Sequence, residues 1–190
     1  MVHRICRIRV GRRLLALALA GLCSAPPAFA LCSDRIRAAT PTARFVLNAD
    51  GTATDKRTGL TWMRCPLGAV LDDGGTPGVP GDDHCVPAGT RTFNWAGALV
   101  ATQQLNAGGG FAGSTAWRVP NRKELLSIVE TRCSGPAINV QVFPDSPVGP
   151  YYTSTTYSPA QSQAWVIDFG SGGELPEPKV STQFLRLVRN

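Results

Sequence analysis

The stretch STAWRVPNRKELLSIVE, residues 114–130, decides the fold because it predicts a β-strand that turns directly into an α-helix. The apolar run over 117–119 ends at Pro120, whose missing backbone N–H takes the chain out of the sheet. Asn121 and Glu124 have the spacing of a capping box, in which the first side chain caps the helix and the second bonds back to the cap residue. The helix then buries an apolar face made by Leu125, Leu126, Ile128 and Val129. This corner builds the fold and contains no catalytic motif.

A second helix is predicted inside FNWAGALVATQQLNAGGG, residues 93–110. Asn94 is suited to cap its N-terminus, and the glycines at 108–110 end it. Helical spacing places five residues on one face: Trp95, Ala98, Leu99, Thr102 and Leu105. The pattern therefore predicts that Trp95 belongs to the core rather than to a ligand platform.

Short strands are predicted on both sides of these helices. The N-terminal strands are joined by tight turns and are Phe45–Leu47, Thr52–Thr54 and Leu60–Met63. The C-terminal strands are YYTSTTYS (151–158), AWVIDFG (164–170) and FLRLVR (184–189), the last with apolar residues on both faces. The segment SGGELPEPK, residues 171–179, is predicted as a loop between the last two strands.

Residues 1–30 predict a signal peptide, so the protein is expected to be exported and to begin at Leu31 once processed. Five arginines precede the apolar core LLALALAGL, and AFA at 28–30 suits a cleavage site. The apolar core is shorter than the roughly 20 residues that a membrane-spanning helix needs, which weighs against the alternative of an uncleaved anchor. No second apolar run of that length follows, and no membrane span is expected in the mature chain.

The positive charge of the chain belongs mostly to this leader. The leader contains five of the 19 Lys and Arg residues and none of the 13 acidic residues, so cleavage lowers the net charge from +6 to about +1. A nearly neutral domain lacks the basic field of a nucleic-acid-binding protein. We therefore expect no nucleic-acid partner, and the sequence predicts no cofactor.

Four cysteines follow the leader, an even number that favours two disulfides in an exported chain. Cys65 and Cys85 flank one loop rich in Gly, Asp and Pro and are the natural local pair, which leaves Cys32 with Cys133. The alternatives are free thiols or a zinc site, although the chain has no C-x-x-C and only His84 as a histidine after the leader.

The loop over 66–84 shows no apolar periodicity and carries four acids, Asp72, Asp73, Asp82 and Asp83. They are either calcium ligands or, as the simpler interpretation, solvated loop residues. No metal site is predicted.

Seven ordered segments resemble successive motifs of the Lcl C-terminal domain, a family named after the Legionella collagen-like adhesins. They are DGTATDKRTGLTWMRC, FNWAGAL, WRVPNRKELLSIVE, PAINVQVFP, YYTSTT, AWVIDFG and LRLVRN. The resemblance runs from about Phe45 to Arg189, with Val119 and Tyr152 standing where Leu and Trp are expected. It divides the mature chain into an extended lead-in over 31–44 and one domain over 45–190.

The resemblance implies an α+β, C-type-lectin-like fold, in which two helices pack on a small, mostly antiparallel sheet. Cysteines placed like the two pairs above occur in the family, so disulfides are expected to stabilise the domain. The corner WRVPNRKEL is also similar to one in the formylglycine-generating enzymes, which share the broad architecture. Kinship of fold does not transfer activity.

A binding or adhesion role is the leading hypothesis, since the named adhesins bind sulfated polysaccharide. Four cations in and around the helix that Asn121 caps are candidates for binding a sulfated glycan: Arg118, Arg122, Lys123 and Arg132. Tyr151 and Tyr152, with Tyr157, form a candidate aromatic edge for a sugar or another envelope protein. The simpler alternatives are solvated charges for the first group and ordinary strand residues for the second.

Two other functions remain open at this point. An assembly subunit of the cell envelope is the main alternative. Catalysis is not expected, because a hydrolase needs a base beside its nucleophile and His84 is the only histidine that remains for this role. The carboxylates Asp145 and Asp168 are a formal glycosidase pair, but each is more simply a turn or strand-end residue.

Overall fold

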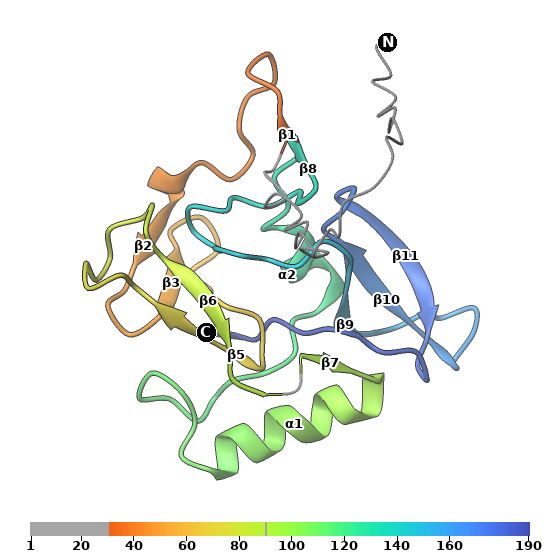
Figure 1. Ribbon diagram of the computed structural model, residues 1–190. Coiled ribbons are helices and arrows are strands. Elements are labelled where there is room, and N and C mark those ends of the chain that lie inside the picture. Colours follow the sequence, from red (N-terminus) through yellow and green to blue (C-terminus); the bar gives the residue numbers. More distant parts are fainter. Residues whose placement is uncertain (1–30, 90) are drawn as a thin grey trace, which may run out of the picture.

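Two β-sheets form the body of the protein in a computed structural model that describes residues 31–89 and 91–190 (Figure 1). The predicted signal peptide lies outside these residues. One sheet has the strand order β11 (Gly173–Pro178), β10 (Gln163–Asp168), β9 (Pro150–Thr156), β12 (Gln183–Phe184) and β7 (Thr92–Phe93). The other has the order β13 (Val188–Arg189), β4 (Thr61–Met63), β3 (Thr52–Asp55) and β2 (Phe45–Leu47). All pairings are antiparallel except β12 with β9.

Two small ribbons and the helices complete the described chain. The ribbons pair β1 (Leu31–Cys32) with β8 (Cys133–Ser134) and β5 (Ala69–Asp72) with β6 (His84–Pro87). The helices are η1 (Thr42–Arg44), α1 (Trp95–Ala107) and α2 (Arg122–Leu126). Figure 1 shows α2 between the two large sheets and α1 along the lower edge of the molecule. The α+β class and the largely antiparallel pairing are confirmed, while the C-type-lectin-like assignment stays a prediction.

The corner over 114–130 has the predicted capping box but a weaker strand and a shorter helix than predicted. Asn121 Oδ1 accepts from the Glu124 N–H, and Glu124 Oε2 accepts from the Asn121 N–H. The predicted strand is a single bridge between Arg118 and Val188. Because α2 has only five residues and successive side chains point about 100° apart, Leu125 is fully buried while Leu126 is 39% exposed. The prediction that Leu126 faces the core was wrong.

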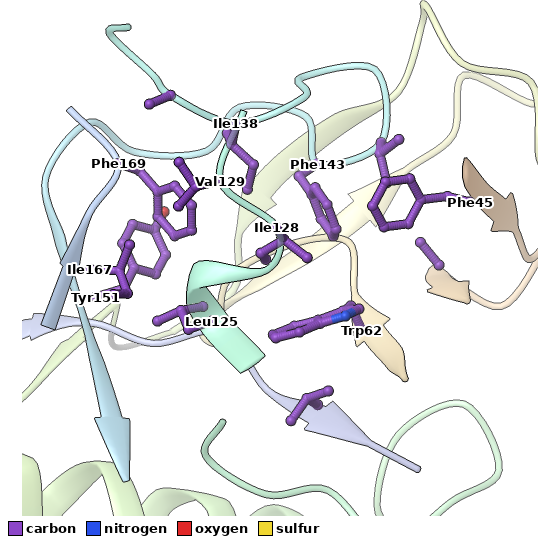
Figure 2. Packing of buried hydrophobic residues seen from close by; sticks show 14 residues of the cluster. Phe45, Trp62, Leu125, Ile128, Val129, Ile138, Phe143, Tyr151, Ile167 and Phe169 are labelled. Carbon is purple, nitrogen blue, oxygen red and sulfur yellow. The ribbon is translucent and has the colours of Figure 1, made fainter. Parts of the chain in front are cut away.

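The main core lies around α2 and joins the two sheets. Figure 2 shows Leu125 and Ile128 between Trp62 of β4 on one side and Tyr151 and Ile167 of the larger sheet on the other. All five side chains are fully buried. The capped corner therefore places apolar side chains between the two sheets, and their burial stabilises this region.

Helix α1 begins at its predicted cap. Asn94 Oδ1 accepts from the Gly97 N–H at 2.7 Å, and Ala98 and Thr102 are buried on the predicted face. Trp95 packs against the cluster of Tyr152, Ala164 and Val166, and its indole N–H donates to the Thr153 carbonyl at 3.0 Å. Trp95 is therefore a half-buried residue at the margin of the core.

Three predicted segments differ in the structure. Residues 171–179 were predicted as a loop but contain the edge strand β11, which pairs with β10 along its whole length. Prolines are tolerated in an edge strand, since one side of it needs no ladder hydrogen bonds, and Pro176 and Pro178 hid the pattern. Residues 184–189 contribute to two short strands rather than one, because Phe184 pairs within the larger sheet and Val188 and Arg189 pair with β4 of the other sheet. The loop over 66–84 contains β5 and ends where β6 begins, and these two strands form a hairpin.

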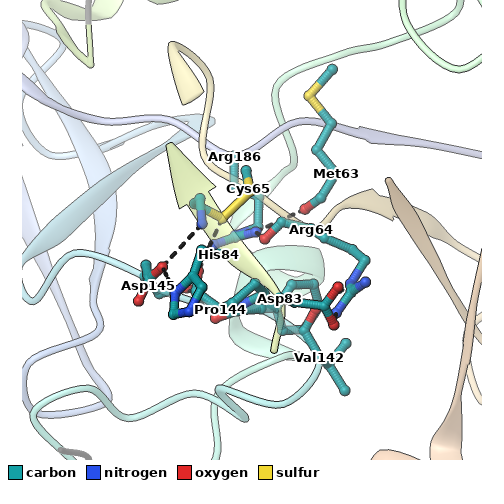
Figure 3. Close-up of a disulfide and its surroundings, with 12 residues drawn as sticks. Met63, Arg64, Cys65, Asp83, His84, Val142, Pro144, Asp145 and Arg186 are labelled. Atoms are coloured by element: carbon teal, nitrogen blue, oxygen red, sulfur yellow. Dashed lines mark hydrogen bonds and ion pairs between the residues drawn. A yellow bond between two sulfur atoms is a disulfide. The ribbon is translucent and has the colours of Figure 1, made fainter. Parts of the chain in front are cut away.

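Both predicted disulfides are present. Cys65 pairs with Cys85, and Cys32 pairs with Cys133. Figure 3 shows the first of these bridges beside His84 and Asp145. Among the described residues, none of the helices combines the length and apolar character that crossing a membrane requires.

The lead-in is fastened to the domain by the carboxylate of Glu130. Glu130 Oε2 accepts from the N–H and hydroxyl of Thr40 at 2.8 and 2.9 Å, and Oε1 accepts from the N–H groups of Ala39 and Arg132 at 3.0 and 3.2 Å. Burial raises the pKa of Glu130, but these hydrogen bonds outweigh burial and hold the pKa below its ordinary value of 4.5.

Replacing Glu130 with Gln is expected to lower the free energy of unfolding at pH 7 by about 1–3 kcal/mol, because an amide cannot accept all four bonds. A lowered folded pKa stabilises the protein fully above pH 4.5, and this stability is lost as the pH falls through the folded pKa. The difference between wild type and Glu130→Gln should therefore shrink below pH 4.5. Urea unfolding between pH 7 and pH 2 measures it. Asp34→Asn, at an exposed residue of the same lead-in, is the control, and an equal loss for both variants would contradict this role of Glu130.

Candidate functional site

A cleft of about 500 Å³ lies where the start of α2 meets the larger sheet. Its lining combines an ion pair, an ammonium, an amide, a hydroxyl and one apolar side chain. The residues are Arg122, Glu174, Lys123, Asn121, Thr155 and Leu126. The lining residues come from α2 and its cap residue, from β9 and from β11. These elements are far apart in the sequence, so the cleft exists only in the folded domain.

Arg122 and Glu174 form a two-pronged ion pair inside this cleft. The Nε and Nη2 groups of Arg122 each donate to one carboxylate oxygen of Glu174, with an Nε–Oε2 distance of 2.5 Å. The hydrogen bond from Arg122 holds the pKa of Glu174 below its ordinary value, and the same bond raises the pKa of Arg122. Both groups are therefore charged at neutral pH.

An aromatic pair supports the guanidinium of Arg122. Its Cζ atom lies 3.9 Å from the ring centroid of Trp165, a cation–π distance. Tyr157 meets Trp165 edge to face, with centroids 5.1 Å apart. Both aromatic side chains are half-buried. Arg122 is thus held in one orientation by contacts within the fold.

Strand register explains why these residues meet. β10 and β11 align Trp165 with Pro176 and Ile167 with Glu174. Since every second residue of a strand lies on the same face, Trp165 and Glu174 share the face that α2 covers. The backbone N–H of Arg122 donates to Thr155 Oγ1 of β9 at 3.0 Å and fixes the start of the helix over that face.

The four candidate cations do not form a single patch. Arg122 and Lys123 line the cleft. Arg118 donates to both oxygens of Glu124 at 2.8 and 2.9 Å, which is a second neutralised pair. Arg132 lines a separate cavity of about 300 Å³ together with Glu130. Two of the four cations, Arg118 and Arg122, are therefore paired with carboxylates in the structure.

The prediction that Tyr151 and Tyr152 form an accessible edge was wrong. Both side chains are 0% exposed, because β9 is a central strand covered on both faces. Burial raises the pKa of each hydroxyl to about 12. The single hydroxyl proton of Tyr152 has two carbonyl acceptors in reach, Pro178 at 2.7 Å and Ser181 at 3.0 Å from Oη, so its polar end is satisfied within the fold.

The residues considered for catalysis or metal binding have other partners. His84 Nδ1 lies 3.0 Å from Asp145 Oδ2 at the exposed start of β6. Asp168 accepts from the Gly170 N–H and the Ser171 hydroxyl in a turn. Asp83 is buried against Arg64 instead of facing the other loop acids. Across residues 31–89 and 91–190, no three His, Cys, Asp or Glu side chains gather in a way that could hold a metal ion.

Sequence reasoning missed two residues that shape the cleft, Glu174 and Trp165. Glu174 lies in a segment predicted as a loop, and its partner Arg122 is 52 residues away. Trp165 was predicted only as a strand residue. The signal in the sequence was an acid, Glu174, in the segment that follows the predicted strand containing Trp165. Such a signal is weak evidence for a site.

Two sheets joined by a capped helix, two disulfides and a polar cleft define a disulfide-stabilised α+β domain. The chain belongs to the Lcl C-terminal domain family, whose family model matches residues 51–189. The match includes α1, α2 and every residue that lines the cleft. No curated protein sequence matches the chain.

Proposed function

We propose that the protein is an exported, non-catalytic binding module that recognises a glycan in the cleft between α2, β9 and β11. The observation that carries the proposal is the ion pair of Arg122 and Glu174, held against Trp165 in a cleft of about 500 Å³. The two disulfides support export, because such bonds persist in oxidising compartments.

The chemistry of the lining suits a sugar. A pyranose presents hydroxyl groups that both donate and accept hydrogen bonds, together with apolar C–H surfaces. The cleft supplies donors from Arg122, Lys123 and the Asn121 amide, acceptors from Glu174, and an apolar wall from Leu126. Because the aromatic support and the ion pair fix Arg122 in advance, little conformational entropy is lost when a ligand binds.

The non-catalytic part of the proposal follows from the partners of the reactive side chains. Cys32, Cys65, Cys85 and Cys133 are all engaged in disulfides. His84 pairs with an exposed carboxylate, and within residues 31–89 and 91–190 the hydrogen bonds of its side chain include no serine or cysteine.

Glycan binding can be tested with two arginines of similar exposure. Arg122 and Arg132 have side chains that are 38% and 35% exposed, and only Arg122 lines the cleft. The disulfide-bonded protein would be screened against neutral oligosaccharides and heparin on an array, with hits measured by calorimetry. Arg122→Ala is expected to weaken the best hit at least tenfold, about 1.4 kcal/mol, and Arg132→Ala to leave it unchanged. Equal losses, or no glycan bound at all, would refute the site.

A further inference from the structure

We infer that the cleft selects neutral, hydroxyl-rich glycans, and that Glu174 is the residue that excludes sulfated and carboxylated ones. The inference rests on the proposed function and specifies its ligand class. The sequence analysis led to the opposite expectation, because it grouped Arg122 with other cations as a candidate site for a negatively charged, sulfated glycan. The contacts of Arg122 within the fold are the reason for the change.

An anion would need the donors that Glu174 already occupies. Arg recognises sulfate or carboxylate through two parallel N–H donors in one plane. Here Nε and Nη2 of Arg122 donate to the two oxygens of Glu174 in that arrangement. The carboxylate of Glu174 therefore stands where the anionic group of a ligand would bind.

Displacing Glu174 from Arg122 would be unfavourable for an anionic ligand. Glu174 would be left ionised beside the incoming charge, and like charges at contact distance repel. Lys123 leaves the lining with a single net positive charge, which offers a polyanion little attraction.

A neutral diol meets none of these obstacles. Adjacent hydroxyls can donate to the outer lone pairs of the Glu174 carboxylate, and a hydroxyl oxygen can accept from Nη1 of Arg122, which is the nitrogen not engaged by Glu174. The ion pair then stays intact and acts as a single unit with donors and acceptors side by side. Polar recognition of this kind also discriminates strongly against ligands that lack the matching hydroxyls.

Glu174→Gln tests the inference, with Glu177→Gln as a matched control. Glu177 is on the same strand but aligns with Ala164, so its side chain lies on the opposite face of the sheet from Glu174. Both substitutions change the net charge of the protein by the same amount. Wild type is expected to bind a neutral oligosaccharide from the array and to bind heparin at least tenfold more weakly. Glu174→Gln should gain at least tenfold in heparin affinity, with a steep salt dependence, and lose affinity for the neutral glycan. Adding Arg122→Ala should abolish the gain.

The outcomes separate this inference from the proposed function. If wild type binds a neutral glycan through Arg122 but Glu174→Gln gains no heparin affinity, the role of Glu174 is refuted and the binding function stands. An equal gain for Glu174→Gln and Glu177→Gln would also refute it, since net charge alone would explain the effect. If neither wild type nor Glu174→Gln binds any glycan, the proposed function fails as well. Melting curves check folding, and Glu174→Ala serves as a second variant if Gln disturbs the fold.

Discussion

Asp83→Ala is expected to lower the free energy of unfolding by about 3–5 kcal/mol, because it leaves a buried guanidinium without its counter-charge. Arg64 and Asp83 are both almost fully buried, with Arg64 Nη2 2.6 Å from Asp83 Oδ2. Arg64 Nε also donates to the Val142 carbonyl at 2.9 Å. Figure 3 shows the three residues together. Since Arg64 cannot reach water when Asp83 is removed, the desolvation of its charge would no longer be compensated.

A second buried cation increases the expected loss. Arg186 is fully buried, and burial lowers its pKa to about 10, which leaves it charged at neutral pH. It donates to the carbonyls of Met63 and Arg64 and, at 2.8 Å, to Ser146 Oγ. Without Asp83, two neighbouring guanidiniums would share this interior with only neutral acceptors.

The neighbouring Asp82 is the control for this measurement. Asp82 is exposed and accepts only a hydroxyl bond from Thr76, so Asp82→Ala should change the free energy of unfolding by less than about 0.5 kcal/mol. Guanidinium chloride unfolding with the disulfides intact compares the two variants. Adding Arg64→Met to Asp83→Ala should restore part of the loss, because an apolar side chain suits the vacated interior. Equal stability of the Asp82 and Asp83 variants would show that the buried pair is unimportant.

The two disulfides are expected to contribute unequally to stability. Cys32–Cys133 closes a loop with a sequence separation of 101, and Cys65–Cys85 closes one of 20. In the chain-entropy account, the longer closure restricts the unfolded state more, which gives roughly 4–5 kcal/mol for the first bridge and roughly 3 kcal/mol for the second.

Paired alanine variants test this order. Cys32→Ala with Cys133→Ala should lower the free energy of unfolding more than Cys65→Ala with Cys85→Ala, as measured by urea unfolding under non-reducing conditions. Peptide mapping would verify that the remaining bridge is intact in each variant. The reverse order would mean that native contacts around the hairpin of β5 and β6, rather than loop length, determine what each bridge contributes.

Local chemistry made much of the fold predictable. The capping box of α2 and the cap of α1 involve residues three positions apart, and both appear in the structure. The hairpin around Asp50-Gly51 and the disulfide across the 66–84 loop also join near neighbours in the chain. Such features are readable because their free energy depends on short-range geometry, which the order of residues largely specifies.

Predictions of burial were less successful, because the same residue type can lie on the surface in one protein and in the interior of another. Tyr151 and Tyr152 have the composition of an exposed aromatic edge, but Tyr151 packs in the main core around α2 and Tyr152 packs in the cluster that Trp95 covers. The sequence also indicates no partner for Arg186 in the last predicted strand, and the structure encloses this cation with the backbone carbonyls of Met63 and Arg64. Strand order, which the sequence does not display, decides whether such positions meet water.

The sequence by itself indicated the family, favoured the disulfide pairing that the structure shows, and specified the capping box of the corner over 114–130. Only the tertiary structure decided that Arg122 meets Glu174 over Trp165 and that Asp83 turns inward to Arg64. The physical reason is that caps and turns are satisfied within a few residues, whereas a charge acquires its partner, and with it its role in binding or stability, from segments that come together when the chain folds.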